Sequence, residues 1–434
     1  MADRIGVVEQ KKSVVSGPLR QRAPSTEAQF ADANIGSPSL SSDASLYWLA
    51  LGTFAVGTEG HMIAAILPRI SADLVVSVET AGQLVTIFAL TYALSSPILT
   101  AFMGHFDRRR VLLAAMAAFA VTNVLAAIAP TYGSLAIARV LLAISAGLYV
   151  PNANALGSAL VAPEKRGSAL AIVSGGLGVA VAIGVPLGSL IGDTFGWRVA
   201  FVGVAVLAGI AFVGLLNGLP ANVGKGLAVM TLRERLLVVR QPGALVTLLQ
   251  TTLFAIGAYA AYTYVALLLS TIAGFTGKGI SIALFLFGVS AFLGIVVGGN
   301  LSDRIGGRRV AALTMPLLAV VFIMISTLPH WLPVSEAGGF MLALVAVWGF
   351  ASWAFFPAQQ ARLIAITGAR AGPIALSLNS SCLYLGFSIG AAAGSMVLTF
   401  GSAPDLGWAS ALFVFLSFAL FFVKAAPGSV RSTA

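Results

Sequence analysis

Two ionisable side chains stand inside long apolar stretches of this sequence, and their types suit the handling of a proton. Glu59 lies in the segment Gly57-Thr-Glu-Gly-His61, and Arg139 lies in an apolar run over about 134–160. An unpaired charge in an apolar interior is costly, so each residue is a candidate functional group. Reversible protonation is one interpretation of Glu59, and a static salt bridge or a helix–helix hydrogen bond is the alternative.

Arg139 and His61 are the candidate partners of Glu59. If the runs that carry Glu59 and Arg139 point in opposite directions, Glu59 lies about 12 Å and Arg139 about 8 Å from the same outer side, so we expect them to meet. Arg139 near a helix end can alternatively snorkel to the surface. His61 stands two residues from Glu59 and therefore faces another side of its helix. Packing and a proton relay both stay open for His61.

The elements that must position these side chains are long apolar helices. The chain has 58% hydrophobic residues, 9% charged residues and a mean hydropathy of +0.96, far from the soluble mix of about a quarter charged. Continuous apolar runs of about 20 residues predict membrane-spanning helices, because lipid offers no partner for exposed backbone amides. The sequence predicts an all-α membrane protein with twelve spans, at about 46–68, 81–102, 111–129, 134–160, 168–192, 198–219, 244–272, 279–301, 310–328, 336–361, 371–399 and 406–423.

The distribution of Lys and Arg predicts the orientation of the spans. Of the 25 basic residues, all but Arg69, Arg139, Arg198 and Lys278 fall in the tails or in connections on the side of the tails. Because basic connections resist translocation, we expect both termini in the cytoplasm and the chain in a bacterial inner membrane. The expected parts are a disordered N-terminal tail (1–44), a six-helix half (45–219), a cytoplasmic linker (220–243), a second six-helix half (244–424) and a C-terminal tail (425–434).

A similar polar sequence follows the second apolar run of each half. The second copy reads Gly299-Asn-Leu-Ser-Asp-Arg-Ile-Gly-Gly-Arg-Arg309, and the more degenerate first copy reads Gly104-His-Phe-Asp-Arg-Arg-Arg110. Two copies at matched places indicate two related halves. Together with the twelve spans, they resemble the loop signature of the major facilitator superfamily, specifically its twelve-helix drug:proton antiporter branch, over about residues 45–424.

The resemblance implies a fold of two pseudo-symmetric six-helix halves and gives roles to several residues. In the family the loop is a charged latch between helices, which implies gating by Asp107, Arg108, Asp303, Arg304 and Arg308. The alternative is a solvated loop whose basic residues only reflect the general excess of Lys and Arg in cytoplasmic loops. The motif Ile137-Ala-Arg139 resembles the family's fourth-helix motif and implies proton handling. The segment around Pro186 resembles the antiporter motif, for which we expect a kinked, tightly packed pivot in gating.

By the same resemblance, the first, fourth, seventh and tenth helices line a central cavity. A wall of aromatic faces and a few amides suits a small, moderately polar or amphipathic solute. Packing or interhelical hydrogen bonding is the alternative for each residue. The spans of the second half contain no expected buried charge, so proton coupling is assigned to the first half. The expected substrate contacts are Asn152, Asn154, Gln250, Tyr259, Tyr262, Trp353 and Asn379, with Trp348, Gln359 and Gln360 nearby.

These observations favour a proton-coupled secondary transporter that exports a small organic solute of drug, sugar or nucleoside type by alternating access. Inward proton symport and facilitated diffusion are the alternatives, and a non-transporting receptor is a weaker one. No phosphate-binding loop occurs, and Cys382 with three scattered His residues offers no metal site or catalytic pair, so we expect no enzyme, cofactor or metal. The net charge of +10 reflects topology, so we expect lipid, protons and a small solute as partners, no nucleic acid, and a monomer.

Overall fold

The structure is a computed structural model that describes residues 40–103, 106–162, 165–221, 223, 238–239 and 241–422. From Leu40 onward the chain forms one compact unit. The described part contains helices and no strand, which confirms the all-α class. Residues 1–39 of the expected tail, most of the expected linker 220–243 and the C-terminal tail 425–434 lie outside the described residues.

Twelve helical segments of the described residues are long and apolar enough to cross a membrane, as the sequence predicted. The tail face is defined here as the membrane side at which α1 begins, and the far face as the side at which α1 ends. Successive spans then alternate in direction. The helices are α1 (Leu40–Asp73), α2 (Val78–Phe102), α3 (Arg108–Ala127), α4 (Tyr132–Ala159), α5 (Arg166–Val179), α6 (Val185–Phe195), α7 (Trp197–Gly218), α9 (Pro242–Tyr262), α10 (Val265–Ala273), α11 (Lys278–Ile305), α12 (Gly307–Trp331), α13 (Ala337–Phe400) and α14 (Asp405–Ala419).

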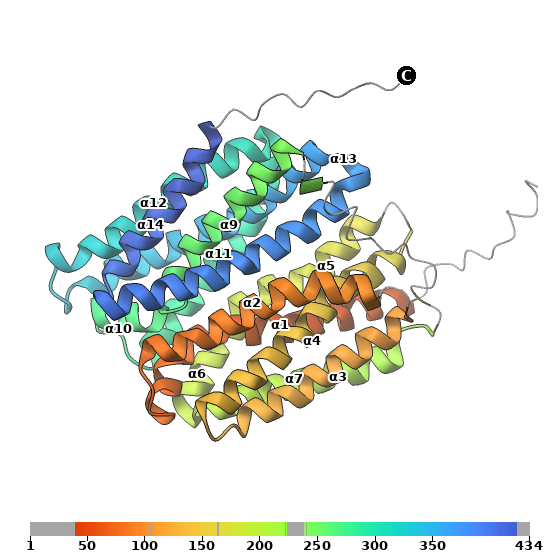
Figure 1. Cartoon of the computed structure of the whole chain (residues 1–434), viewed down its shortest axis with the longest axis horizontal. Helices are drawn as coiled ribbons and strands as arrows, with labels where there is room; N and C mark the ends of the chain where they lie inside the picture. The colour runs from red at the N-terminus through yellow and green to blue at the C-terminus, as the bar shows by residue number, and fades with distance from the viewer. Residues whose placement is uncertain are drawn as a thin grey trace, which may run out of the picture. The chain divides into compact units, whose positions relative to one another are not determined.

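The long helix α13 contains two spans, Ala337–Gly368 and Ile374–Phe400. They are joined at Gly368, whose φ of 76° is a left-handed conformation that favours glycine. Helices α1–α7 pack mainly on one another, and so do α9–α14, as the warm and cool colours of Figure 1 show. Between the two groups, α2 packs against α13, and α11 packs against α5 and α6.

Large apolar side chains remain exposed along the outer helix faces. Val213 of α7 is 54% exposed, Phe285 of α11 is 52% exposed and Leu313 of α12 is 62% exposed. A soluble monomer rarely exposes contiguous apolar patches of this extent, whereas lipid accepts them at no cost. The exposed faces therefore belong to a protein solvated by a bilayer.

The expected pivot near Pro186 takes the form of a π-helical turn, η4 (Ala180–Gly184), which separates α5 from α6. Proline lacks an N–H and its ring crowds the preceding turn, and a wider turn accommodates both effects. A Cβ on Gly184 would overlap Thr58 of α1, and a Cβ on Gly288 of α11 would overlap the backbone of Val181. The widened turn thus lies at a close three-way contact between α1, the π turn and α11.

The seventh predicted run, 244–272, is not one continuous helix, and this expectation was wrong. It divides into α9 and α10 at Thr263 and Tyr264. The Thr263 hydroxyl donates to the Tyr259 carbonyl at 2.7 Å, a back-bond that bends helices. The Tyr264 hydroxyl donates to the Ala391 carbonyl of α13 at 3.2 Å. Side-chain hydrogen bonding interrupts a run that apolar composition alone does not break.

Candidate functional site

The two buried charges of the first half form an ion pair. Arg139 Nη1 of α4 donates to Glu59 Oε1 of α1, and neither side chain has any solvent exposure. The Thr131–Ser134 capping box starts α4 and places Arg139 about two turns inside it. The expected meeting of the two residues is therefore confirmed. Their contact is deeper along α1 than expected, about 21 Å from its far end, because α1 continues to Asp73.

Arg139 also connects the ion pair to α2. Its Nε donates to the Leu84 carbonyl at 3.2 Å, and its guanidinium carbon lies 4.2 Å from the centre of the Phe88 ring, a cation–π distance. Arg139 therefore ties α1, α2 and α4 together. Burial without exposed nitrogen excludes the alternative in which Arg139 snorkels to the surface.

The hydrogen bonding of the ion pair is incomplete. Glu59 Oε2 and Arg139 Nη2 are buried without a hydrogen-bond partner among the described residues. A buried polar atom left without a partner costs about 1–3 kcal/mol, and more when it is charged. Desolvation already opposes a buried pair, so the pair is a poor stabiliser in this arrangement. Glu59 Oε2 can therefore accept a proton or a hydrogen bond, and Arg139 Nη2 can donate a hydrogen bond to another polar group.

His61 lies on another side of α1, as expected, and faces rings of the second half. Its Nδ1 is 2.9 Å from the Gly57 carbonyl, so Nδ1 carries the proton of a neutral ring and Nε2 is left as an acceptor. The ring centre of His61 lies 6.2 Å from Tyr259, 6.2 Å from Tyr262 and 6.0 Å from Trp353. We call these four side chains the aromatic junction, because they join α1 to α9 and α13.

The Tyr262 hydroxyl is the unsatisfied polar group of the aromatic junction. It is buried without a hydrogen-bond partner among the described residues. A tyrosine hydroxyl in a buried position normally finds a partner. The junction therefore offers a free hydroxyl and the Nε2 acceptor of His61 between flat apolar faces. This combination can hold a ring-containing solute that also forms hydrogen bonds.

Two further ring contacts lie beside the junction and were not predicted. Tyr92 of α2 stacks on Tyr384 of α13 with ring centres 3.7 Å apart, and Phe387 stacks on Tyr259 at 3.5 Å. The Tyr92–Tyr384 stack joins α2 of the first half to α13 of the second half, and the Tyr259–Phe387 stack joins α9 to α13. Tyr92 and Tyr384 were not predicted because, apart from Asn379 of the eleventh span, the expected contacts came from the helices assigned to the cavity wall.

The two groups of helices are joined by hydrogen bonds near the far face. Ser388 of α13 donates to the Thr86 carbonyl of α2 at 3.1 Å, and Ser395 donates to the Glu79 carbonyl at 3.2 Å. Ser281 of α11 donates to Ser189 of α6 at 3.1 Å. Each bond joins the first half to the second, so the far side of their interface is held together in this structure.

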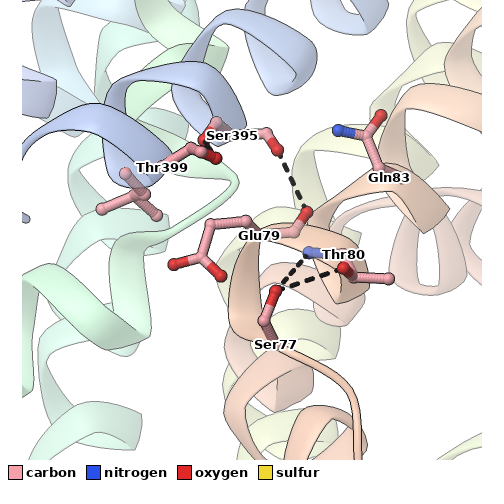
Figure 2. A pocket seen from close by; sticks show the side chains of 7 residues that line it. Ser77, Glu79, Thr80, Gln83, Ser395 and Thr399 are labelled. Atoms are coloured by element: carbon pink, nitrogen blue, oxygen red, sulfur yellow. Dashed lines mark hydrogen bonds between the residues drawn. The ribbon is translucent and has the colours of Figure 1, made fainter.

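A surface cavity of about 410 Å³ lies where α2 and α13 meet at the far face. Figure 2 shows Ser77, Glu79 and Thr80 on one wall and Ser395 and Thr399 on the other, with the Glu79 carboxylate between them. The bond from Ser395 to the Glu79 backbone crosses this cavity. The cavity is thus lined by side chains of both halves.

The amides expected to contact substrate lie apart from the aromatic junction. Asn152 Nδ2 donates to the Leu148 carbonyl of its own helix at 2.7 Å, and Asn154 Oδ1 accepts from Ser174 at 3.0 Å. Gln250 Nε2 lies 3.4 Å from the Ser417 carbonyl of α14, and Asn379 Oδ1 accepts from Thr251 at 2.7 Å. Each makes a packing contact in this structure. Of the expected contacts, Tyr259, Tyr262 and Trp353 are the ones that converge.

The two copies of the polar loop differ in structure. Asp107 precedes α3, and its carboxylate accepts from the N–H groups of Arg109 at 2.9 Å and Arg110 at 3.4 Å as an N-cap. Asp303 instead lies in the last turn of α11, which ends before Gly306 with its φ of 87°. Asp303 therefore lies near the C-terminal end of a helix, whereas Asp107 lies at a helix start. The turn at Gly306 reverses the chain after that residue.

The remaining gating candidates lie at the tail face. Arg108 is the first residue of α3, Arg304 is exposed near the end of α11, and Arg308 is the second residue of α12. No ion pair joins the two loop copies in the part of the chain that the structure describes. The unpredicted Arg109 donates to the Leu216 and Leu219 carbonyls at 2.8 and 3.0 Å and so satisfies the end of α7.

Comparison with known proteins shows which family of proteins this chain resembles. A family model of the Major Facilitator Superfamily matches residues 49–331 and 247–434. The chain is 35% identical over 373 residues to the uncharacterized MFS-type transporter YbcL of Bacillus subtilis, covering 86% of this chain and 93% of that protein. It is 33% identical over 353 residues to the inner membrane transport protein YdhP of Escherichia coli K12, covering 81% and 88%.

A relative named for drug resistance has a similar sequence identity to this chain. The chloramphenicol resistance protein of Streptomyces lividans is 35% identical over 378 residues, covering 85% of this chain and 93% of that protein. Each of the three alignments is longer than either half, so the similarity extends over parts of both halves.

Proposed function

The chain belongs to the major facilitator superfamily and is a multi-pass membrane transporter, and we propose that it exports a small organic solute across a bacterial inner membrane in exchange for protons. The observation that carries the proposal is the fully buried Glu59–Arg139 pair beside the aromatic junction. A titratable carboxyl and a candidate solute site then lie next to each other at the interface of the halves.

Glu59 is the proposed proton carrier. It is the one carboxyl side chain that is fully buried among the described residues. A proton on Glu59 cancels its charge and removes most of its attraction for Arg139. Arg139 is then free to interact more strongly with its other partners, the Leu84 carbonyl and the Phe88 ring. Because α1 carries both Glu59 and His61 of the aromatic junction, a shift of α1 on protonation would change the surroundings of the solute.

The aromatic junction is the proposed solute site. Three rings from the second half and His61 from the first can hold a flat, partly apolar solute on both sides of the interface. Tyr262 and His61 supply a donor and an acceptor. The chloramphenicol resistance relative supports an aromatic, hydrogen-bonding drug as the solute class. His61 acts here as a solute contact, with a proton relay as the second candidate role.

Alternating access follows from the placement of the contacts between halves. We assign the far face to the outside and the tail face, with both termini, to the cytoplasm, because the basic residues concentrate on the tail side. On that assignment the hydrogen bonds of Ser388, Ser395 and Ser281 lie towards the outer side, which supports an inward-facing state for this structure. Release outward requires these bonds to break while the loops that carry Asp107 and Asp303 close the cytoplasmic side.

The test uses purified protein in liposomes with a pH-sensitive dye trapped inside. A thermal-shift screen of antibiotics, nucleosides, sugars and amino acids first selects a ligand, with chloramphenicol as the first compound. Addition of that ligand should then move protons in the direction opposite to the solute, and an imposed pH gradient should drive solute accumulation. Solute and protons that move in the same direction would establish symport instead. Solute movement that ignores the gradient would establish facilitated diffusion.

A further inference from the structure

Two arginines of the second half converge on one aromatic ring at the tail face. The guanidinium carbon of Arg362 in α13 lies 4.5 Å from the centre of the Phe421 ring, and that of Arg308 in α12 lies 6.0 Å from the same centre. Arg308 Nη2 is also 3.5 Å from the Phe421 carbonyl. Phe421 belongs to the short 3₁₀ turn η5 (Leu420–Phe422) that follows α14. Three separate spans therefore supply this cluster.

Arg362 is held in place inside the protein. The sequence assigned it to a loop after a span ending at 361, but the first span of α13 continues to Gly368, about 9 Å further. Arg362 Nη1 donates to Gln359 Oε1 at 2.7 Å, and Gln359 Nε2 donates to the Thr247 carbonyl at 2.8 Å. Arg362 is only partly buried, so the described spans of the second half contain no fully buried charged residue, as expected, although Arg362 lies within a span. This guanidinium is anchored and does not swing freely.

The charges of Arg308 and Arg362 are not balanced by an ion pair among the described residues. None of the four ion pairs found among the described residues includes Arg308 or Arg362. Arg362 uses one of its five N–H groups in the described hydrogen bonds. Two like charges around one half-buried ring repel each other unless an anion lies between them. The remaining N–H groups are donors of the planar, forked kind that bind phosphate oxygens.

We propose that Arg308, Arg362 and Phe421 form a binding site for the phosphate group of an anionic membrane phospholipid. The site lies where α12 begins and α14 ends, at the level of the lipid headgroups. Apolar surface continues from it along the last span: Phe422 is 74% exposed and Phe415 is 60% exposed. A free phosphate ion has no apolar group that could contact this surface, whereas the acyl chains of a phospholipid can pack against it.

The occupied site would brace the tail ends of the second half. The lipid phosphate joins the start of α12 to the end of the first span in α13, and Phe421 connects both to α14. Gly307 packs at this same place, with its Cβ position 3.2 Å from Arg362 Cγ. An anionic lipid should therefore stabilise the full-length protein more than a zwitterionic lipid of the same chain length does.

The test measures the thermal unfolding temperature (Tm) of full-length protein in detergent during titration with dioleoyl phosphatidylglycerol, dioleoyl phosphatidylcholine or sodium phosphate. Phosphatidylglycerol should raise the Tm in a saturable way. Arg308→Gln and Arg362→Gln should each weaken its apparent affinity at least about ten-fold, equivalent to about 1.4 kcal/mol. Arg309→Gln is the matched control, because it removes the same charge from an exposed neighbour with no described contact to Phe421.

Three results would overturn the lipid site. Phosphatidylcholine could stabilise as well as phosphatidylglycerol, sodium phosphate alone could reproduce the full effect, or Arg309→Gln could weaken binding as much as the other two variants. If Arg362→Gln does not fold, the exposed Arg308 still decides the question. Retained lipid molecules counted by native mass spectrometry give an independent readout, with at least one fewer phosphatidylglycerol on Arg308→Gln than on Arg309→Gln.

Discussion

Arg139 of α4 donates a hydrogen bond to Glu59 of α1, at a depth where neither side chain reaches solvent. The two residues are 80 positions apart in the sequence, so the fold of the first half brings them together. The hydrogen bonding of this pair is incomplete, because one oxygen of Glu59 and one nitrogen of Arg139 are buried without partners among the described residues. A pair selected only for stability would be expected to satisfy both atoms.

The first prediction concerns the stability of this pair. Arg139→Gln leaves the Glu59 carboxyl buried opposite a neutral amide, so the variant should lose about 3–5 kcal/mol and unfold at a clearly lower Tm in detergent. The double variant Glu59→Gln/Arg139→Gln removes both charges and should recover much of that loss. A double variant that is less stable by the sum of the two single effects would show that the residues are not energetically coupled.

The second prediction concerns closure at the far face. The Ser189 and Ser281 hydroxyl oxygens are 3.1 Å apart on different halves, and cysteines at both positions can form a disulfide in a Cys382→Ser background. Oxidation should stop transport, and reduction should restore it, because the halves can then no longer separate at that face. Each single cysteine variant is the control. Full transport by the cross-linked protein would refute the proposed opening at this contact.

The third prediction concerns the Tyr262 hydroxyl. It has no hydrogen-bond partner in the part of the chain that the structure describes, so Tyr262→Phe should leave the Tm unchanged or raise it. The same variant should weaken solute binding about ten-fold, the effect of one lost hydrogen bond. Tyr264→Phe is the matched control, since its hydroxyl donates to the Ala391 carbonyl. That variant should be less stable and bind solute normally. Normal solute affinity in Tyr262→Phe would remove the hydroxyl from the proposed site.

The fold was largely predictable from the sequence, whereas the neighbours of each polar residue were not. Twelve apolar runs determine twelve spans because lipid cannot satisfy backbone groups. Glu59 and Arg139 were identifiable because a charge in such a run is rare. By contrast, amides such as Gln250 and Asn379 fit a cavity wall or a helix contact equally well, and the structure gives them partners at Ser417 and Thr251.

The errors in prediction share a physical cause. The break between α9 and α10 depends on side-chain bonds from Thr263 and Tyr264, which hydropathy does not register. Arg362 was placed in a loop because a charged residue usually ends an apolar run, yet Gln359 and Phe421 hold it within α13. In both cases tertiary contacts of single side chains decide the local structure.

The fourth prediction concerns gating by the second polar loop. Asp303 is exposed at the end of α11 and forms no ion pair among the described residues. We expect it to form one in the state in which the cytoplasmic side is closed. Asp303→Asn should slow transport several-fold without changing solute affinity, because it affects the change of state and not the solute site. Glu336→Gln is the control, because Glu336 is an exposed acid directly before α13. Loss of solute binding by Asp303→Asn would contradict the assignment.

The most direct test of the account is the separation of exchange from proton-driven transport in Glu59→Gln. In liposomes, this variant should exchange labelled for unlabelled solute at a rate close to that of the wild type, yet accumulate no solute when a pH gradient is imposed. Glu79→Gln, the same substitution at the far-face cavity, should retain both activities. Gradient-driven accumulation by Glu59→Gln at the wild-type level would contradict the central claim that this carboxyl couples protons to transport.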